Sequence, residues 1–411
     1  MVKVGWLSSF FQPCGMRMPQ WTKPSYFNPN SCEAGASAGF FSCRIDGESR
    51  NFLQFKREEK GIIPRRVVYY NIGEGGCGMT IREELEAREK EFLSPLAVCS
   101  ADTRGRDKPM KPCPMRTEFQ RDRDRILHCK SFRRLKFKTQ VFIAPEGDHY
   151  RTRLTHTLEV AQVARTLARA MRLNEDLTEA IALGHDLGHT PFGHSGERSL
   201  NRITQSGFRH NEQSLRVVEV LEGGEGLNLT WEVRDGILKH SGQLKPETLE
   251  GECVARADRI AYINHDIDDA IRAGVLKEFE IPHELIRVLG ETHGQRIDTM
   301  ITDIVRESKD QPHLKMSAPI QEASDEMRKF LFERVYLDEW RRAEEEKCDH
   351  VIVTLFEYYM EHPGKMPLEY VQIAYRDGTE RAVTDFLACM TDRYAIRTYQ
   401  NLFVPASFPV F

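Results

Sequence analysis

Residues 157–173 read TLEVAQVARTLARAMRL, and this stretch decides the fold class. Its apolar residues recur every three or four positions, so they form one broad stripe on a helix. The stripe comprises Leu158, Ala161, Val163, Ala164, Leu167, Ala168 and Met171. Because a stripe of this width is typical of a helix that packs on other helices, the stretch predicts a helix within a helical core.

The same helical period continues on both sides of this stretch. It recurs at 176–187, 211–222, 253–272, 281–293, 321–346 and 390–403. The alternation typical of strands is found in only three short segments, VVYY at 67–70, VFIA at 141–144 and VQIAY at 371–375. We therefore predict an all-α fold with at most a minor β-hairpin.

Residues 1–78 differ from the rest of the chain. They are rich in Gly, Ser, Pro, Asn and Cys, and neither the helical nor the strand period persists in them. A charged amphipathic segment begins abruptly at Met79. We expect residues 1–78 to be a disordered extension, or sequence upstream of a true start at Met79. A small accessory module is the alternative.

Composition narrows the class of protein. Among 411 residues, 40% are hydrophobic and 29% charged, which excludes wholesale disorder. The net charge of −4 excludes a global polycation built to wrap nucleic acid. No apolar run approaches the roughly 18 residues that a membrane span needs, and the first residues make a poor secretory signal. We expect a cytoplasmic protein without a membrane partner.

Four polar segments interrupt these apolar helices. They are RTRLTHTLEVAQ at 151–162, ALGHDLGHTPFGH at 182–194, FRHNEQSLR at 208–216 and CVARADRIAYINHDIDDAI at 253–271. Burying a carboxylate is costly unless it is paired or binds a metal. A buried His–Asp pair at 185–186 therefore favours a metal site.

The ligand types limit the metal that such a site would hold. Two imidazoles and two carboxylates suit Mn²⁺, Fe²⁺, Co²⁺, Ni²⁺ or Zn²⁺, and Mg²⁺ less strongly. Four protein ligands on an octahedral ion leave two positions open, which is typical of a catalytic site. A zincin pair at His185 and His189 is disfavoured, because Asp186 stands where that motif needs Glu and Gly188 ends the helix.

One face of the predicted helix at 253–272 is unusually polar. Asp258, Tyr262 and Asp266 are spaced four residues apart and share that face, with Arg259 one position round. Such a face within an apolar segment is costly unless it lines a site. A plain surface helix is the alternative, although Ile260, Ala261 and Ile263 must then still face inward.

The residues His156, His185–Asp186 and Asp258 carry a family resemblance. Their H…HD…D pattern resembles the HD-domain metal-dependent phosphohydrolases. Longer segments resemble the deoxynucleoside triphosphate triphosphohydrolases (dGTPase-like proteins) over about residues 80–408. These segments are RILHCKSFRRLKFKTQVF at 125–142, RTRLTHTLEVAQVAR at 151–165, GHDLGHTPFGHSGE at 184–197 and ADRIAYINHDIDDAI at 257–271.

The resemblance implies an HD-domain helical fold with a helical C-terminal extension, and it assigns roles to thirteen residues. Metal ligation falls to His156, His185, Asp186 and Asp258. Acid–base catalysis falls to His189, His210 and Glu212. Substrate binding falls to Gln140, Arg153, His194, Arg259, Tyr262 and Asp266. The intervening Asn211 departs from relatives in which His directly precedes Glu, which puts Glu212 in doubt.

The implied reaction is hydrolysis of a deoxynucleoside triphosphate (dNTP) to a deoxynucleoside and inorganic triphosphate. Two alternatives stay open at this point. One is another HD phosphohydrolase acting on nucleoside monophosphates, cyclic nucleotides or alarmones, and the other is a non-catalytic dNTP sensor. The resemblance also makes a homo-oligomer the expected state.

The basic segment at 121–138 adds a further candidate site. It carries eight Lys or Arg against two Asp, so an allosteric dNTP or single-stranded nucleic acid could bind there. A solvated helix face with internally paired charges is the alternative. We predict three parts after the N-terminal extension: an N-terminal helical segment at 79–150, an HD catalytic core at 151–275 and a C-terminal helical region at 276–411.

Overall fold

The computed structural model describes residues 40–45, 48–53, 79–140, 150–336 and 339–406. The chain divides into two units, residues 1–68 and 69–411. In the first, strands β1 (Phe40–Ile45) and β2 (Glu48–Leu53) pair antiparallel, with Phe40 opposite Leu53. The sequence showed no alternation in these strands, so this hairpin was not expected there.

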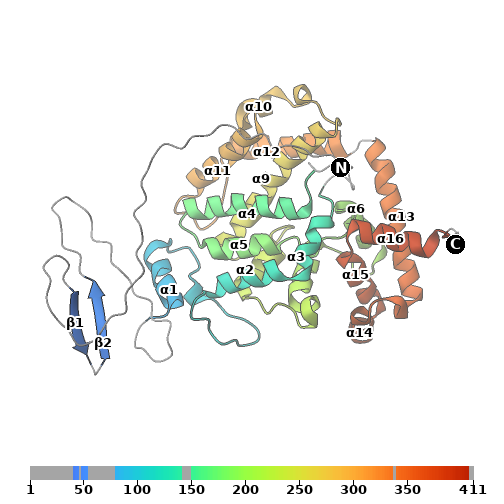
Figure 1. The fold of residues 1–411 in the computed structure, drawn as a ribbon. Coiled ribbons are helices and arrows are strands. Elements are labelled where there is room, and N and C mark those ends of the chain that lie inside the picture. Colours follow the sequence, from blue (N-terminus) through green and yellow to red (C-terminus); the bar gives the residue numbers. More distant parts are fainter. Residues whose placement is uncertain (1–39, 46–47, 54–78, 141–149, 337–338, 407–411) are drawn as a thin grey trace, which may run out of the picture. The chain divides into compact units, whose positions relative to one another are not determined.

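The second unit is built from helices (Figure 1). The first eight are α1 (Ile81–Phe92), α2 (Glu118–His128), α3 (Lys130–Arg134), α4 (Arg153–Ala170), α5 (Glu175–Gly184), α6 (His194–Ile203), α7 (His210–Arg216) and α8 (Trp231–Lys239). The next eight are α9 (Leu249–Arg272), α10 (His283–Leu289), α11 (His293–Ser308), α12 (Ala318–Leu331), α13 (Glu339–Glu361), α14 (Leu368–Asp377), α15 (Thr379–Cys389) and α16 (Asp392–Phe403). The predicted all-α fold with a minor hairpin is confirmed.

Four of the sequence-based element predictions need correction or lie wholly or partly outside the described residues. The predicted strand at 371–375 is wrong, because these residues lie within α14. The predicted helix at 321–346 is formed by α12, by a π-helical segment at Phe332–Tyr336 and by α13, with residues 337–338 outside the described residues. The predicted strands at 67–70 and 141–144 lie outside the described residues.

Polar capping residues fix the first residue of each of the three helices that carry the site. Thr152 precedes α4, and its hydroxyl accepts the backbone N–H of Thr155. Asn174 caps α5 in the same way through Leu177, and Thr248 caps α9 through Gly251. Because each cap satisfies an otherwise unpaired backbone donor, the three helices begin at defined residues.

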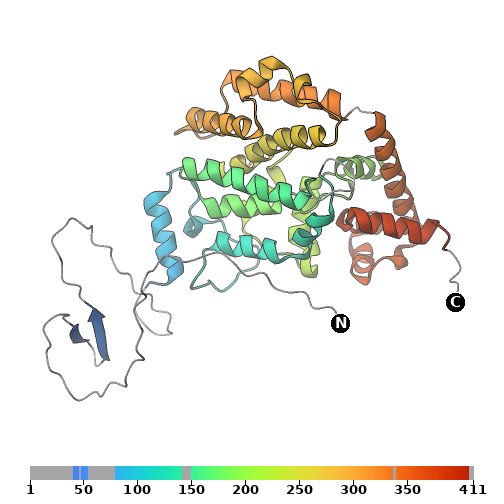
Figure 2. The same ribbon diagram turned by 45° about the horizontal axis from the view of Figure 1, so that its top comes forward.

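The larger of two hydrophobic cores lies around α4, α5 and α9. Both α5 and α9 pack against α4, and α2 and α8 pack on α5 (Figures 1 and 2). Buried residues of this core include Val160, Leu167, Ile181 and Ile263. The predicted stripe of α4 was partly wrong: Leu158 is 49% exposed, whereas Val160, which we had left out, is buried.

A second core joins α6 to the C-terminal helices α13–α16, drawn in orange and red in Figure 1. Leu187 belongs to the larger core and Phe192 to the second. The chain therefore passes from one core to the other within six residues, which include His189. His189 lies within this crossing, and His185 and His194 lie just before and just after it.

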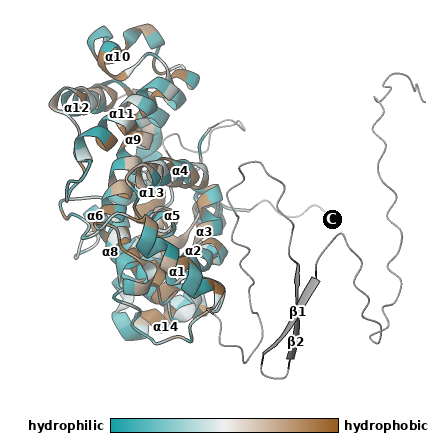
Figure 3. Cartoon of the chain, turned by 90° about the vertical axis from the view of Figure 1, so that its left-hand side faces the viewer, coloured by the Kyte–Doolittle hydropathy of each residue, from teal (hydrophilic) through white to brown (hydrophobic). Residues whose placement is uncertain are grey.

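Helix α1 is mostly charged. It has no buried residue, and teal predominates along it in the hydropathy colouring of Figure 3. Among the described residues, none of the helices combines the length and apolar character that a bilayer crossing requires.

Candidate functional site

Two imidazoles and a carboxylate meet where α4, α5 and α9 pack together. His156 lies in the first turns of α4, His185 directly follows α5, and Asp258 lies near the middle of α9. The Nε2 atom of His156 is 3.0 Å from Oδ1 of Asp258, and Nε2 of His185 is 3.9 Å from the same oxygen. One ligand atom from each residue lies within 4.8 Å of the others, so the three could share a cation.

Asp186 joins this group through His185. Its Oδ2 atom is 3.7 Å from Nε2 of His185 and 2.7 Å from a guanidinium nitrogen of Arg153. Burial opposes ionisation of Asp186, but Arg153 and the neighbouring imidazoles hold its pKa well below the ordinary value. The structure therefore brings the four predicted metal ligands together as two imidazoles and two carboxylates.

The hydrogen bonding of His185 provides a test of whether these residues fit a metal. Its Nδ1–H donates to the backbone carbonyl of Ala182 at 2.6 Å, so in the neutral ring Nε2 carries a lone pair. That buried Nε2 has no hydrogen-bond partner among the described residues, and it faces the carboxylates of Asp186 and Asp258. A lone pair facing two carboxylates is unfavourable unless a cation lies between them, so the residues fit a divalent metal.

A second group of ionisable side chains lies beside the first. Nδ1 of His210 is 2.9 Å from Oε1 of Glu197, and the backbone N–H of His210 donates to the same oxygen at 2.8 Å. Nε2 of His189 is 3.8 Å from Oε2 of Glu197, and its ring stacks on His210 with centroids 4.9 Å apart. The structure therefore brings His189 and His210 together, as the sequence analysis expected.

The pKa values of this second group diverge. Burial opposes the charged forms of His210 and Glu197, but their mutual attraction raises the pKa of His210 and lowers that of Glu197 to about 2. Burial and Arg153 together lower the pKa of His189 well below its ordinary value and that of His194 to about 4. One imidazole with a raised pKa thus lies beside imidazoles with lowered pKa values, and such divergence is typical of acid–base sites.

Glu212 does not reach this group. It is exposed on α7, two residues after His210, which places it about 200° round the helix. The carboxylate that contacts His210 is Glu197, from α6. Glu212 was assigned from the family resemblance, and nothing local in the sequence shows that Glu197 of α6 contacts His210 instead.

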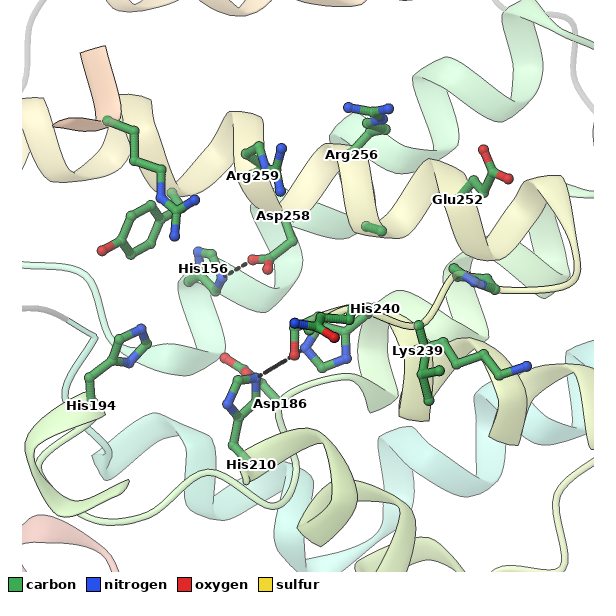
Figure 4. Close-up of a pocket in the computed structure, with 18 of the residues that line it drawn as sticks. His156, Asp186, His194, His210, Lys239, His240, Glu252, Arg256, Asp258 and Arg259 are labelled. Atoms are coloured by element: carbon green, nitrogen blue, oxygen red, sulfur yellow. Dashed lines mark hydrogen bonds and ion pairs between the residues drawn. The ribbon is translucent and has the colours of Figure 1, made fainter. Parts of the chain in front are cut away.

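Both groups face one pocket of about 850 Å³ (Figure 4). In Figure 4 the side chains of His156 and Asp258 point toward one another, with Asp186, His210 and His240 close by. Five of the six predicted substrate-binding residues line this pocket: Gln140, Arg153, His194, Arg259 and Tyr262. The sixth, Asp266, is fully buried and is not among the described lining residues.

Further cations line the same pocket and were missed by the sequence analysis. They are Lys239, Lys245, Arg256, Arg328 and Lys329. Only Arg256 was readable in advance, because it precedes Arg259 by three residues and so shares its side of the helix. The others come from α8, the segment after it and α12, and nothing local in the sequence places these segments beside α9.

His240 was also missed. It directly follows α8, and its Nδ1–H donates to the backbone carbonyl of Ile237 at 2.7 Å. Its Nε2 atom is 3.2 Å from Nε2 of His210, and a ligand atom of His240 lies within 4.8 Å of those of His185 and Asp186. A single histidine at a helix end gives no sequence pattern that could have found it.

The basic segment at 121–138 is largely paired within the protein. Arg123 forms ion pairs with Asp176 and Glu179, and Arg125 donates to the backbone carbonyl of Leu227. Lys138 is buried and donates to the carbonyls of His189 and Ala388. Nucleotide or nucleic-acid binding at this segment stays a prediction.

Comparisons with known proteins match the helical part of the chain. Residues 153–263 match the HD domain family, and residues 314–401 match the phosphohydrolase-associated domain family. A protein from Caldanaerobacter subterraneus named deoxyguanosinetriphosphate triphosphohydrolase-like protein is 60% identical over 80% of this chain and 97% of its own length.

Two further relatives carry the same name. The one from Desulfatibacillum aliphaticivorans is 52% identical, over 80% of this chain and 99% of its own length. The one from Clostridium perfringens strain SM101 is 48% identical, over 80% of this chain and 98% of its own length.

Proposed function

Since the chain belongs to the family of deoxyguanosinetriphosphate triphosphohydrolase-like proteins and contains an HD domain, we propose that it hydrolyses dNTPs to a deoxynucleoside and inorganic triphosphate. One observation carries the proposal. The same cationic pocket is lined by His156, Asp186 and Asp258 of the metal-facing group and by His189 and His210 of the histidine–glutamate group. A polyanionic substrate bound there would have its reacting phosphorus beside both groups.

The cations of the pocket suit a triphosphate. Arg153, Arg259 and Arg256 project from α4 and α9, and Arg328 and Lys329 come from α12. Guanidinium groups bind phosphate oxygens through paired N–H donors, which fixes orientation as well as charge. We assign these residues to holding the triphosphate, and Gln140, His194 and Tyr262 to the α-phosphate and deoxyribose.

Different residues of the site take part in activating the water and in protonating the leaving group. A divalent ion held by His156, His185, Asp186 and Asp258 would polarise a phosphoryl oxygen and make a water molecule more acidic. Water attacks the α-phosphorus, the bond from that phosphorus to the 5′-oxygen breaks, and His210, kept protonated by Glu197, supplies the proton that the 5′-oxygen needs. His189 lies beside His210 and can accept the proton that the attacking water loses.

A product assay tests the proposal. Purified protein is incubated with each dNTP and Mn²⁺ in ¹⁸O-labelled water, and the products are identified by ³¹P nuclear magnetic resonance and mass spectrometry. We expect a deoxynucleoside and triphosphate, with one ¹⁸O in the triphosphate. Release of pyrophosphate or phosphate would identify a different phosphohydrolase, and tight dNTP binding without any product would identify a sensor.

A further inference from the structure

A series of polar contacts extends from His156 through the buried His265 to the partly exposed Glu159. Nδ1 of His156 is 3.4 Å from Nδ1 of His265, and Nε2 of His265 is 3.2 Å from Oε2 of Glu159. His156 and His265 are 1% and 2% exposed, so water does not substitute for these contacts. His156 and Glu159 share one face of α4, one turn apart, and His265 reaches them from α9.

The contact with Glu159 determines which ring nitrogen of His265, and then of His156, carries a proton. An ionised carboxylate only accepts hydrogen bonds, so Nε2 of His265 must carry the proton that it donates to Glu159. In a neutral ring Nδ1 of His265 is then an acceptor, and its only described polar neighbour is Nδ1 of His156. His156 therefore donates from Nδ1, and its lone pair is on Nε2.

That lone pair points to the place where a metal would bind. Nε2 of His156 is the atom that lies 3.0 Å from Oδ1 of Asp258. With the proton on the other ring nitrogen, this contact joins a lone pair to a carboxylate, and it becomes favourable when a cation lies between them. Partners that fix the tautomer of a ligating histidine raise its affinity for the metal.

We infer that His265 and Glu159 are positioning residues for the metal: they hold His156 in the tautomer that presents Nε2 to the ion. Arg151 keeps Glu159 in place, since it bonds both Glu159 and Asp269 of α9. The arrangement uses the same two helices twice. Helix α4 supplies His156 and Glu159, and α9 supplies Asp258 and His265, so the pairing of α4 with α9 sets both the ligands and their support.

Metal affinity, measured without nucleotide, tests this inference on the full chain. The dissociation constant for Mn²⁺ is determined by isothermal titration calorimetry, and the absorption spectrum of the Co²⁺-loaded protein reports the ligand geometry. We expect His265→Leu to raise the dissociation constant by about 10–100-fold and to alter the Co²⁺ spectrum. In His265→Gln, the amide oxygen can accept from His156 and the amide N–H can donate to Glu159, so we expect most of the affinity to return.

Two further variants separate the proposed role from plain packing. His293 stacks on His265 with ring centroids 5.9 Å apart, but it makes none of the polar contacts that join Glu159, His265 and His156. The variant His293→Phe should therefore bind Mn²⁺ like the wild type. Glu159 is 41% exposed, so Glu159→Leu should fold normally and still raise the dissociation constant about tenfold. Thermal unfolding of the apoproteins checks the fold of each variant.

Three outcomes would overturn the inference. They are wild-type Mn²⁺ affinity in both His265→Leu and Glu159→Leu, an equal loss in His293→Phe, or absence of Mn²⁺ binding by the wild type. The inference depends on the metal centre of the proposed function but not on its substrate. A protein that binds Mn²⁺ in this pattern and releases no triphosphate would overturn the proposed function and leave the inference standing.

Discussion

The two halves of the site are supported in different ways. The metal-facing half is attached to α4, α5 and α9, whose apolar faces fill the larger core. The histidine–glutamate half lies where the chain crosses to the second core, and it depends on α6, α7 and the segment between Leu187 and Phe192. The first half is held by the packing of these three helices, whereas the second combines packing of α6 on α13 with polar contacts between distant segments.

Those polar contacts converge on the junction of α15 and α16. Asp392 accepts hydrogen bonds from the backbone N–H groups of Thr139 and Phe192, each at 2.9 Å, and from the Thr139 hydroxyl. Lys138 donates to the carbonyls of His189 and Ala388. The C-terminal helices therefore hold the segments that carry Gln140 and His189. This comparison predicts that a substitution can damage one half of the site and leave the other intact.

The largest effect is expected from the metal-facing half. Asp186→Ala removes a predicted ligand and leaves the buried guanidinium of Arg153 without its partner. We expect hydrolysis to be abolished and stability to fall by about 3–5 kcal/mol. Steady-state kinetics and thermal unfolding measure both effects. A wild-type rate in Mn²⁺-supplemented buffer would contradict the assignment of Asp186.

A smaller effect is expected from the second half, and it distinguishes two carboxylates. Glu197→Gln weakens the charge that keeps His210 protonated, so kcat should fall by about 10²–10⁴-fold while Mn²⁺ affinity stays unchanged. The matched control is Glu212→Gln, whose side chain is exposed on α7 and should leave kcat within about twofold. The reverse order of effects would restore the role that the sequence analysis gave to Glu212.

A third variant tests the contacts that support the second half. Asp392→Asn replaces one buried acceptor oxygen by an amide N–H group, so a donor from Thr139 or Phe192 loses its partner. We expect stability to fall by about 1–3 kcal/mol and kcat by about tenfold, because His189 is less well held. The measurements are chemical denaturation and kinetics. Equal damage to Mn²⁺ affinity would show that the two halves are not separately supported.

The smallest effect is a shift in pH dependence. Glu197 raises the pKa of His210 above its ordinary value, so the protonated form is favoured at lower pH and is lost as the pH rises through the raised pKa. We therefore expect kcat to fall on the alkaline side, and the fall to begin at lower pH in Glu197→Gln. Profiles of kcat against pH for both proteins provide the measurement. An unchanged alkaline limb in Glu197→Gln would exclude His210 as the proton donor.

The same comparison explains what could be predicted from the sequence. His156 and Asp258 lie on helices whose periods are plain, and the pair His185–Asp186 directly follows a third, but the expectation that they form one metal site came from the family resemblance. Glu197 and His240 contact His210 because the starts of α6 and α7 and the end of α8 lie close together in the fold. No local sequence pattern predicts that these segments are neighbours. We expected Asp258, Tyr262 and Asp266 of α9 to line one site together. Asp258 and Tyr262 line the pocket, whereas Asp266 is buried and does not.

The central claim is that His156, His185, Asp186 and Asp258 bind one cation. Anomalous X-ray diffraction from crystals of the full chain grown with Mn²⁺ tests it most directly. We predict one ion about 2.0–2.3 Å from Nε2 of both histidines and from a carboxylate oxygen of both aspartates. An ion bound elsewhere, or one that contacts only a single member of the four, would contradict the account.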